Sequence, residues 1–172
     1  MRWRPFELNR DLPAGKGINK MEMYNQKFGE ARTRQIIPQM AQVGQSVGIN
    51  FSYGGNVGNT FDSHRLIWYA RKVGGSEAQD KIVESVFKAY FEEEKCLSDV
   101  AVLQDCAREA GLDATNLLSD SAMGEVETKA EQREFGRSCR GVPKFIFNGN
   151  YAVGGAQESD TLLEIFKGIA DE

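Results

Sequence analysis

Residues 141–157 read GVPKFIFNGNYAVGGAQ. The apolar run over residues 144–147 is typical of a β-strand, and the pair Asn148-Gly149 that follows is the strongest short signal for a two-residue turn. The residues after this turn return as a second strand, so the stretch predicts a β-hairpin. A final helix is expected beyond it, with its buried side formed by Leu162, Leu163, Ile165, Phe166 and Ile169.

The chain ahead of the hairpin has a helical pattern. Apolar residues recur at three- and four-residue steps over residues 18–47, and Pro38 should kink this region or split it into two helices. Residues 60–73 predict a further helix, which should end at the Gly-Gly pair that follows.

Two capping signals mark the start of later helices. Ser76 and Gln79 have the spacing of a capping box, in which each side chain bonds the backbone of the other residue. Ser98 or Asp99 should cap the next helix. Residues 113–137 should form one more helical region ahead of the hairpin. The sequence therefore predicts a block of helices between its N-terminal segment and the hairpin.

The N-terminal segment, WRPFEL at residues 3–8, alternates in the manner of a strand. Pro5 restricts it to the edge or the start of a sheet, because proline cannot donate to a strand ladder. One edge strand and one hairpin make a sheet that is too small to be stable alone. A strand that belongs in the middle of this sheet is not found in the sequence.

Composition limits the classes of function. A length of 172 residues is ordinary for one domain, and the net charge of −4 argues against binding to nucleic acid or to an anionic membrane surface. No apolar run approaches the roughly 18 residues of a membrane span. The N-terminus has no apolar signal-peptide core, which predicts a cytoplasmic location.

The three cysteines, Cys96, Cys106 and Cys139, contain no CxxC pair and do not have the spacing of a metal site. Reduced thiols are the simplest interpretation, with Cys106 in the core, although a bridge between Cys96 and Cys106 stays open. Cys139 lies between Arg137 and Arg140, whose charges favour a thiolate. It is a candidate for a reactive thiol.

Three segments together resemble the DsbA-like thioredoxin family, and within it the FrnE-type disulfide oxidoreductases. They are GVPKFIFNG with YAVGGAQ at residues 141–157, RWRPFELN at residues 2–9, and NTFDSHRLI at residues 59–67. The resemblance implies one α/β domain over residues 1–172, a thioredoxin-like fold with a large all-helical insertion. The thioredoxin part would be residues 1–12 and about 126–172, and the insertion about 13–125.

The resemblance also implies what the functional site contains. In the family, a first, central strand and a CxxC motif precede the RWRPFELN segment, and this sequence shows neither. No residue therefore inherits the catalytic role, and Cys139 does not stand at the CxxC position. The substrate-binding residues that the resemblance does transfer are Val142 and Pro143, joined by a cis peptide bond, with His64 near the same groove.

Three functions follow as expectations. The first is thiol–disulfide exchange with a protein or a small molecule that carries a thiol or a disulfide. This reaction would need no cofactor, and the sequence as given is expected to be inactive because it has no CxxC motif. The second is a kappa-type glutathione transferase or 2-hydroxychromene-2-carboxylate isomerase, which would bind glutathione. The third is a non-catalytic module that binds an extended peptide beside Pro143. The oligomeric state stays open.

Overall fold

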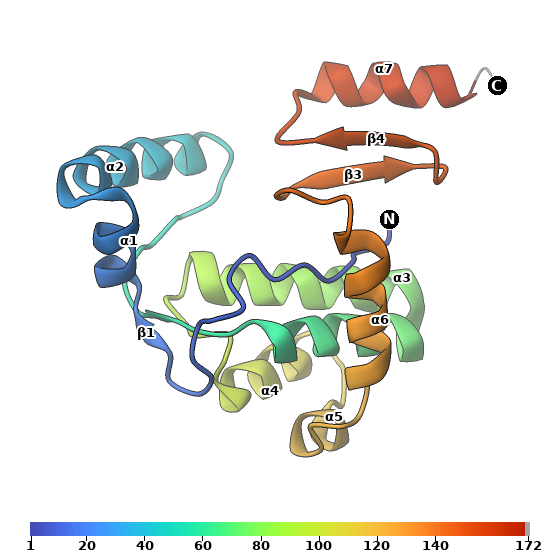
Figure 1. The fold of residues 1–172 in the computed structure, drawn as a ribbon, viewed down its shortest axis with the longest axis horizontal. Coiled ribbons are helices and arrows are strands. Elements are labelled where there is room, and N and C mark those ends of the chain that lie inside the picture. The colour runs from blue at the N-terminus through green and yellow to red at the C-terminus, as the bar shows by residue number, and fades with distance from the viewer. Residues whose placement is uncertain (171–172) are drawn as a thin grey trace.

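The computed structural model describes residues 1–170. It has three parts: a body of helices, an arm formed by α1 and α2, and a β-hairpin with the C-terminal helix (Figure 1). In chain order the elements are β1 (Ile18–Asn19), α1 (Lys20–Phe28), α2 (Glu30–Ser46), β2 (Asn56–Val57), α3 (Phe61–Phe91), α4 (Val100–Glu109), α5 (Thr115–Ser119), α6 (Glu125–Gly136), β3 (Lys144–Phe147), β4 (Tyr151–Gly154) and α7 (Ser159–Ala170).

The strands of the described residues form two separate antiparallel pairs, β1 with β2 and β3 with β4. The second pair is the predicted hairpin, with Phe145 opposite Val153 and Phe147 opposite Tyr151. The turn residue Asn148 takes a positive φ of 47°, and Gly149 one of 77°, as a tight hairpin turn requires. The hairpin lies where the sequence predicted it, but its turn has three residues and not two, because Phe147 pairs with Tyr151 and leaves Asn148, Gly149 and Asn150 between the strands.

Helix α3 consists of two halves that meet at Gly75. This glycine has φ 70° and ψ −156°, a conformation outside the helical region that side chains disfavour. The first half ends there, as predicted from the Gly-Gly pair. The chain then reverses, so that the two halves lie side by side (Figure 1). Their facing sides form the core with α4 and α5, through Leu66, Ala70, Ile82, Val86, Leu103, Cys106 and Leu117 among others.

The start of α4 follows its predicted cap. The Asp99 side chain accepts a hydrogen bond from the backbone N–H of Ala101, which satisfies one of the otherwise unpaired donors of the first turn. The helical region expected over residues 113–137 is interrupted, because residues 120–124 form a turn between α5 and α6.

The prediction for residues 18–47 was wrong in its detail. The region does split into two helices, but at Gly29, whose φ of 84° and ψ of 145° end α1 and begin α2. Pro38 lies inside α2. It is exposed there, so water can reach the carbonyl group that proline leaves without a donor.

The N-terminal segment is not a strand, contrary to expectation. Its Trp3 pairs instead with a side chain: the Gln79 Oε1 atom accepts from the Trp3 backbone N–H at 3.1 Å, and Gln79 Nε2 donates to the Trp3 carbonyl at 3.2 Å. The Trp3 indole donates to Asp80 Oδ1 at 2.7 Å. The predicted capping box is wrong for the same reason, since buried Gln79 faces Trp3 and not Ser76.

We expect Gln79→Leu to lower the free energy of unfolding by about 1–3 kcal/mol, because it removes the partners of two partly buried backbone groups without removing volume. Urea denaturation followed by circular dichroism measures the change. Gln39→Leu, an exposed position on α2, is the matched control. Equal stability of the two variants would contradict the role assigned to Gln79.

The hairpin and α7 pack mainly on one another. The rings of Phe147 and Phe166 meet edge to face, with centroids 5.5 Å apart. No residue of α7 is buried, and Phe166 is 56% exposed. None of the helices within residues 1–170 combines the length and apolarity that crossing a membrane requires.

Candidate functional site

The loop that joins α6 to β3 carries three of the candidate residues, Cys139, Val142 and Pro143. The peptide bond between Val142 and Pro143 is cis. The Pro143 carbonyl accepts a hydrogen bond from the Gly155 N–H at 2.8 Å, which ties the loop to the end of β4. The start of the loop is tied to β3, because Lys144 Nζ donates to the Ser138 carbonyl at 3.0 Å and to Ser138 Oγ at 2.6 Å. These bonds give the loop a defined shape.

One edge of β3 is unpaired. Its partner on the other edge is β4, and their ladder begins at Lys144 opposite Gly154. No second strand pairs with β3 within residues 1–170. Val142 stands just ahead of this ladder and is 47% exposed. The free edge of β3 and the Val142 backbone are therefore open to an extended chain.

His64 lies in the first turn of α3, where its backbone N–H bonds the Thr60 carbonyl at 3.1 Å. Its ring faces the N-terminal segment, beside the backbone of Phe6 and the carboxylate of Glu7. Burial lowers the pKa of His64 to about 4, although Glu7 and the Phe6 hydrogen bond act in the opposite direction. The imidazole is therefore neutral at neutral pH.

The structure brings Cys139, Val142 and Pro143 into one loop, but no hydrogen bond, ion pair or ring contact among residues 1–170 joins His64 to that loop. The partners of His64 belong to the N-terminal segment. This segment is in turn held by α6, because Gln132 Nε2 donates to Glu7 Oε2 at 2.9 Å. The His64 side chain thus lies between helix α3 and the N-terminal segment.

All three cysteines are free, so the bridge between Cys96 and Cys106 that the sequence left open is not present. Cys106 is buried in the core, as predicted, and burial raises the pKa of its thiol. Cys139 is partly exposed and donates from Sγ to the Gly141 carbonyl at 2.9 Å. Nowhere in residues 1–170 do three His, Cys, Asp or Glu side chains gather as a metal would require.

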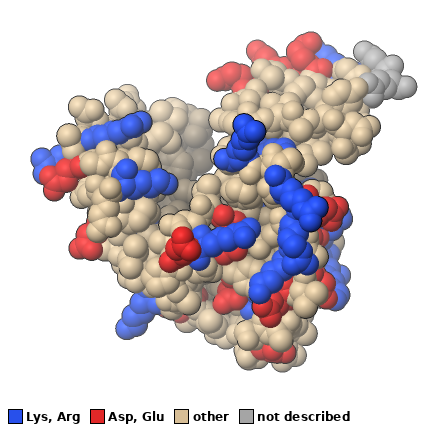
Figure 2. Space-filling view, viewed as in Figure 1, with Lys and Arg blue, Asp and Glu red and all other residues tan. Residues whose placement is uncertain are grey.

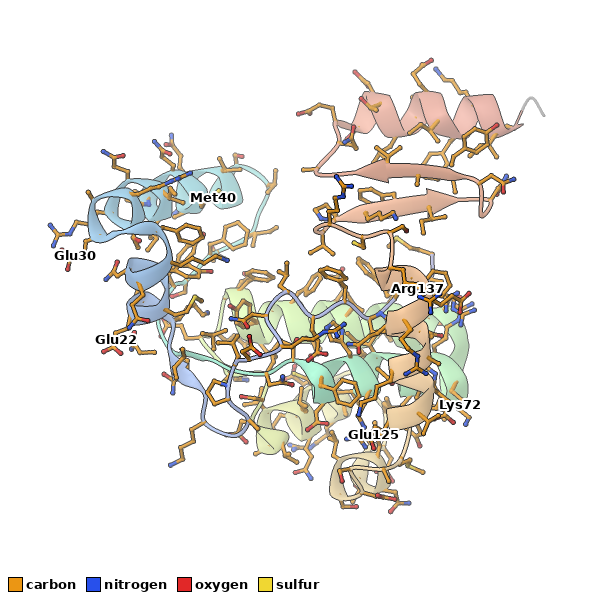
Figure 3. The ribbon with its side chains drawn as sticks, viewed as in Figure 1. Glu22, Glu30, Met40, Lys72, Glu125 and Arg137 are labelled. Carbon is orange, nitrogen blue, oxygen red and sulfur yellow. The ribbon has the colours of Figure 1, made fainter. Side chains whose placement is uncertain are left out.

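The sequence reasoning missed a row of aromatic side chains. Its rings touch in succession from the arm to the N-terminal segment, with centroids 5.7 to 6.5 Å apart: Phe28, Tyr24, Tyr53, Phe51, Phe91, Phe87 and Trp3. Figure 3 shows aromatic side chains gathered between the arm and the upper side of α3. The four-residue steps from Tyr24 to Phe28 and from Phe87 to Phe91 were the available signal. The aromatic row gives this side of the molecule an apolar surface, on which Phe28, Phe87 and Phe91 are exposed.

A buried lysine fixes the arm beside this row. Lys20 Nζ donates to the Tyr90 carbonyl at 3.1 Å and lies 4.0 Å from the centre of the Tyr90 ring. Burial lowers the pKa of Lys20, against the attraction of Glu94 and Cys96. Burial also raises the pKa of the Tyr90 hydroxyl. These contacts hold α1 against the second half of α3.

A comparison with models of protein families gave a match over most of the chain. None of the curated proteins compared with this chain matches it. The family model of the DSBA-like thioredoxin domain matches residues 1–167. This match takes in the N-terminal segment, all the helices as far as α6, the loop with the cis-proline, and the hairpin. The chain therefore belongs to the family of DSBA-like thioredoxin domains, the disulfide oxidoreductase family of thioredoxin-like fold.

Proposed function

We propose that this chain is the substrate-binding side of a FrnE-type thiol–disulfide exchange site, and that it holds an extended segment of a protein substrate next to Val142 and Pro143. The observation that carries the proposal is the free edge of β3. A polypeptide that adds to such an edge gains main-chain hydrogen bonds, while pockets beside the edge select its side chains.

Two further features support this assignment. Val142 lies in the loop immediately before the edge and exposes its side chain, so a bound segment would contact it directly. The aromatic row offers an apolar surface within the same molecule, and exposed apolar patches of this kind mark binding sites. Neither feature is needed to close the core, which lies between α3, α4 and α5.

The exchange chemistry itself needs two thiols. One must attack the substrate disulfide as a thiolate, and a second must resolve the mixed disulfide that forms. Cys106 is buried, and Cys96 and Cys139 belong to different parts of the structure. No pair of thiols within residues 1–170 is placed for both steps. We therefore expect this polypeptide to bind substrate without reducing insulin.

Peptide binding tests the proposal. A fluorescein-labelled peptide of alternating Val and Thr should bind with a rise in anisotropy. The same peptide N-methylated along one edge should bind at least about tenfold more weakly, since it lacks main-chain donors. Val142→Asp should weaken binding to a similar degree. Val73→Asp, at an exposed position on α3, is the control and should leave binding unchanged.

Three outcomes would overturn the proposal. Equal affinity of the plain and N-methylated peptides would exclude pairing with the β3 edge. Saturable binding of glutathione in a calorimetric titration would favour the kappa-type glutathione transferase alternative. Insulin reduction that disappears in Cys139→Ser would make Cys139 a nucleophile and this chain a catalyst in its own right.

A further inference from the structure

A line of positive charge follows one face of α6. Lys129, Arg133 and Arg137 recur at four-residue steps along this helix and its C-terminal cap, and Arg140 follows in the loop. All four side chains are exposed. Figure 2 shows Lys and Arg as a continuous blue line over this part of the molecule, and Figure 3 labels Arg137 at one end of α6 and Glu125 at the other. We call these four residues the basic ridge.

Most of the charge of the basic ridge is not neutralised. Lys129 forms an ion pair with Glu125, but Arg133, Arg137 and Arg140 form no ion pair with any residue of the range 1–170. Glu131, on another face of α6, instead binds Arg2 and Arg4 at 2.8 and 2.7 Å. A positive strip therefore stands on a chain whose net charge is −4.

The fold does not need this arrangement. Like charges four residues apart on a helix repel one another by about 0.2–0.5 kcal/mol per pair. None of the three arginines caps a carbonyl group or covers the core within residues 1–170. The guanidinium group is, however, the cation best suited to binding a carboxylate, because its planar fork can make two parallel hydrogen bonds.

We infer that the basic ridge binds an acidic segment of another polypeptide in an extended conformation. Residues four apart on a helix are separated by about 6 Å along its axis. Alternate residues of an extended chain are separated by about 6.6 Å. Carboxylates at every second position of a bound segment would thus match successive cations of the ridge.

The apolar surroundings also fit such a segment. Val126 is 72% exposed on the same face of α6, one turn or less from Lys129. An acidic segment with occasional aliphatic residues could cover both. This inference does not depend on the proposed exchange function, because the basic ridge lies on α6 and not at the edge of β3. The two are tested separately, since the peptide offered to the ridge contains no thiol or disulfide.

The test uses a fluorescein-labelled peptide of about eight residues in which Glu alternates with Ser, a length that spans the ridge when extended. We expect binding to the native protein that weakens as salt is raised. Arg133→Gln/Arg137→Gln should reduce the affinity at least about tenfold, since two charge-assisted contacts are lost. Arg133→Lys/Arg137→Lys should retain most of it. The control, Arg32→Gln/Arg34→Gln on α2, makes the same change in net charge and should bind as the native protein does.

Several results would overturn the inference. Equal weakening in the α2 control would mean that net charge, and not the basic ridge, attracts the peptide. Affinity that does not change with salt would exclude the carboxylate contacts. Tighter binding of a short DNA duplex than of the Glu peptide, lost in the same α6 variant, would assign the ridge to nucleic acid instead. Circular dichroism establishes that each variant is folded.

Discussion

Replacing Arg65 with Met should lower the free energy of unfolding by about 3–5 kcal/mol, because it leaves several backbone carbonyl groups without their donor. Arg65 is only 2% exposed, although it carries a full charge. Its guanidinium donates to the Met123 carbonyl at 2.7 and 3.0 Å and to the Leu117 carbonyl at 2.9 Å. It also pairs with Asp62 at 2.7 Å. One side chain thus binds carbonyl groups at the end of α5 and in the turn before α6.

The size of this loss of stability follows from the carbonyl groups that Met would leave without a hydrogen-bond donor. The carbonyl groups at the end of α5 and in the next turn have no further helical turn to donate to them. Without Arg65 they are left partly buried and unpaired, and each costs about 1–3 kcal/mol. The hydrophobic gain from the Met side chain offsets only part of this loss.

Urea denaturation of Arg65→Met, followed by circular dichroism, measures the change. Arg32→Met, at an exposed position on α2, is the control and should differ from the native protein by less than about 0.5 kcal/mol. Arg65→Lys keeps the charge but not the fork, so it should fall between the two. Equal stability of Arg65→Met and the control would show that the turn is held by other contacts.

The second large effect is a pH dependence that His64 imposes on stability. Its pKa is about 4 in the folded protein, against about 6.5 in an unfolded chain. Because the unfolded chain takes up the proton first, stability should be highest above pH 6.5 and should fall as the pH drops toward 4. A difference of this size corresponds to up to about 3 kcal/mol.

His64→Gln isolates this contribution, because His64 is the only histidine in the chain. Denaturation midpoints measured between pH 7 and 4.5 should fall for the native protein more steeply than for the variant. Glu7 faces the same ring and is present in both proteins, so the difference between the two curves reports the loss of His64. Parallel curves would contradict a buried, neutral imidazole.

The elements that the sequence predicted correctly are those with a local cause. Asn148 and Gly149 supply the positive φ angles of the hairpin turn, Asp99 caps the helix that follows it, and Gly75 adopts a backbone conformation that other residues disfavour. The N-terminal segment failed because its partner is remote in sequence: the groups that pair with Trp3 belong to Gln79. Alternation of apolar residues indicates that one side of a segment is buried. It does not identify which groups will form hydrogen bonds with the backbone of that segment.

The candidate site divides in the same way. The loop with Val142 and Pro143 is continuous in sequence, so its composition could be predicted before its geometry was known. The position of His64 depends on the packing of α3 against the N-terminal segment, which no local pattern reports. Arg65 carries a charge in the middle of a helical stretch, and such residues are ordinarily exposed. Nothing in the sequence distinguishes it from its exposed neighbours.

The absence of buried residues from α7 has a consequence for the order in which the molecule opens. Local opening requires less free energy where few apolar groups are buried, and such regions act as separate cooperative units. The hairpin with α7 is one such region, whereas α3, α4 and α5 share the core. On warming, amide protons of the C-terminal unit would exchange with solvent before those of α3. The strand that presents the free edge would therefore be lost while most of the helix content of the protein persists.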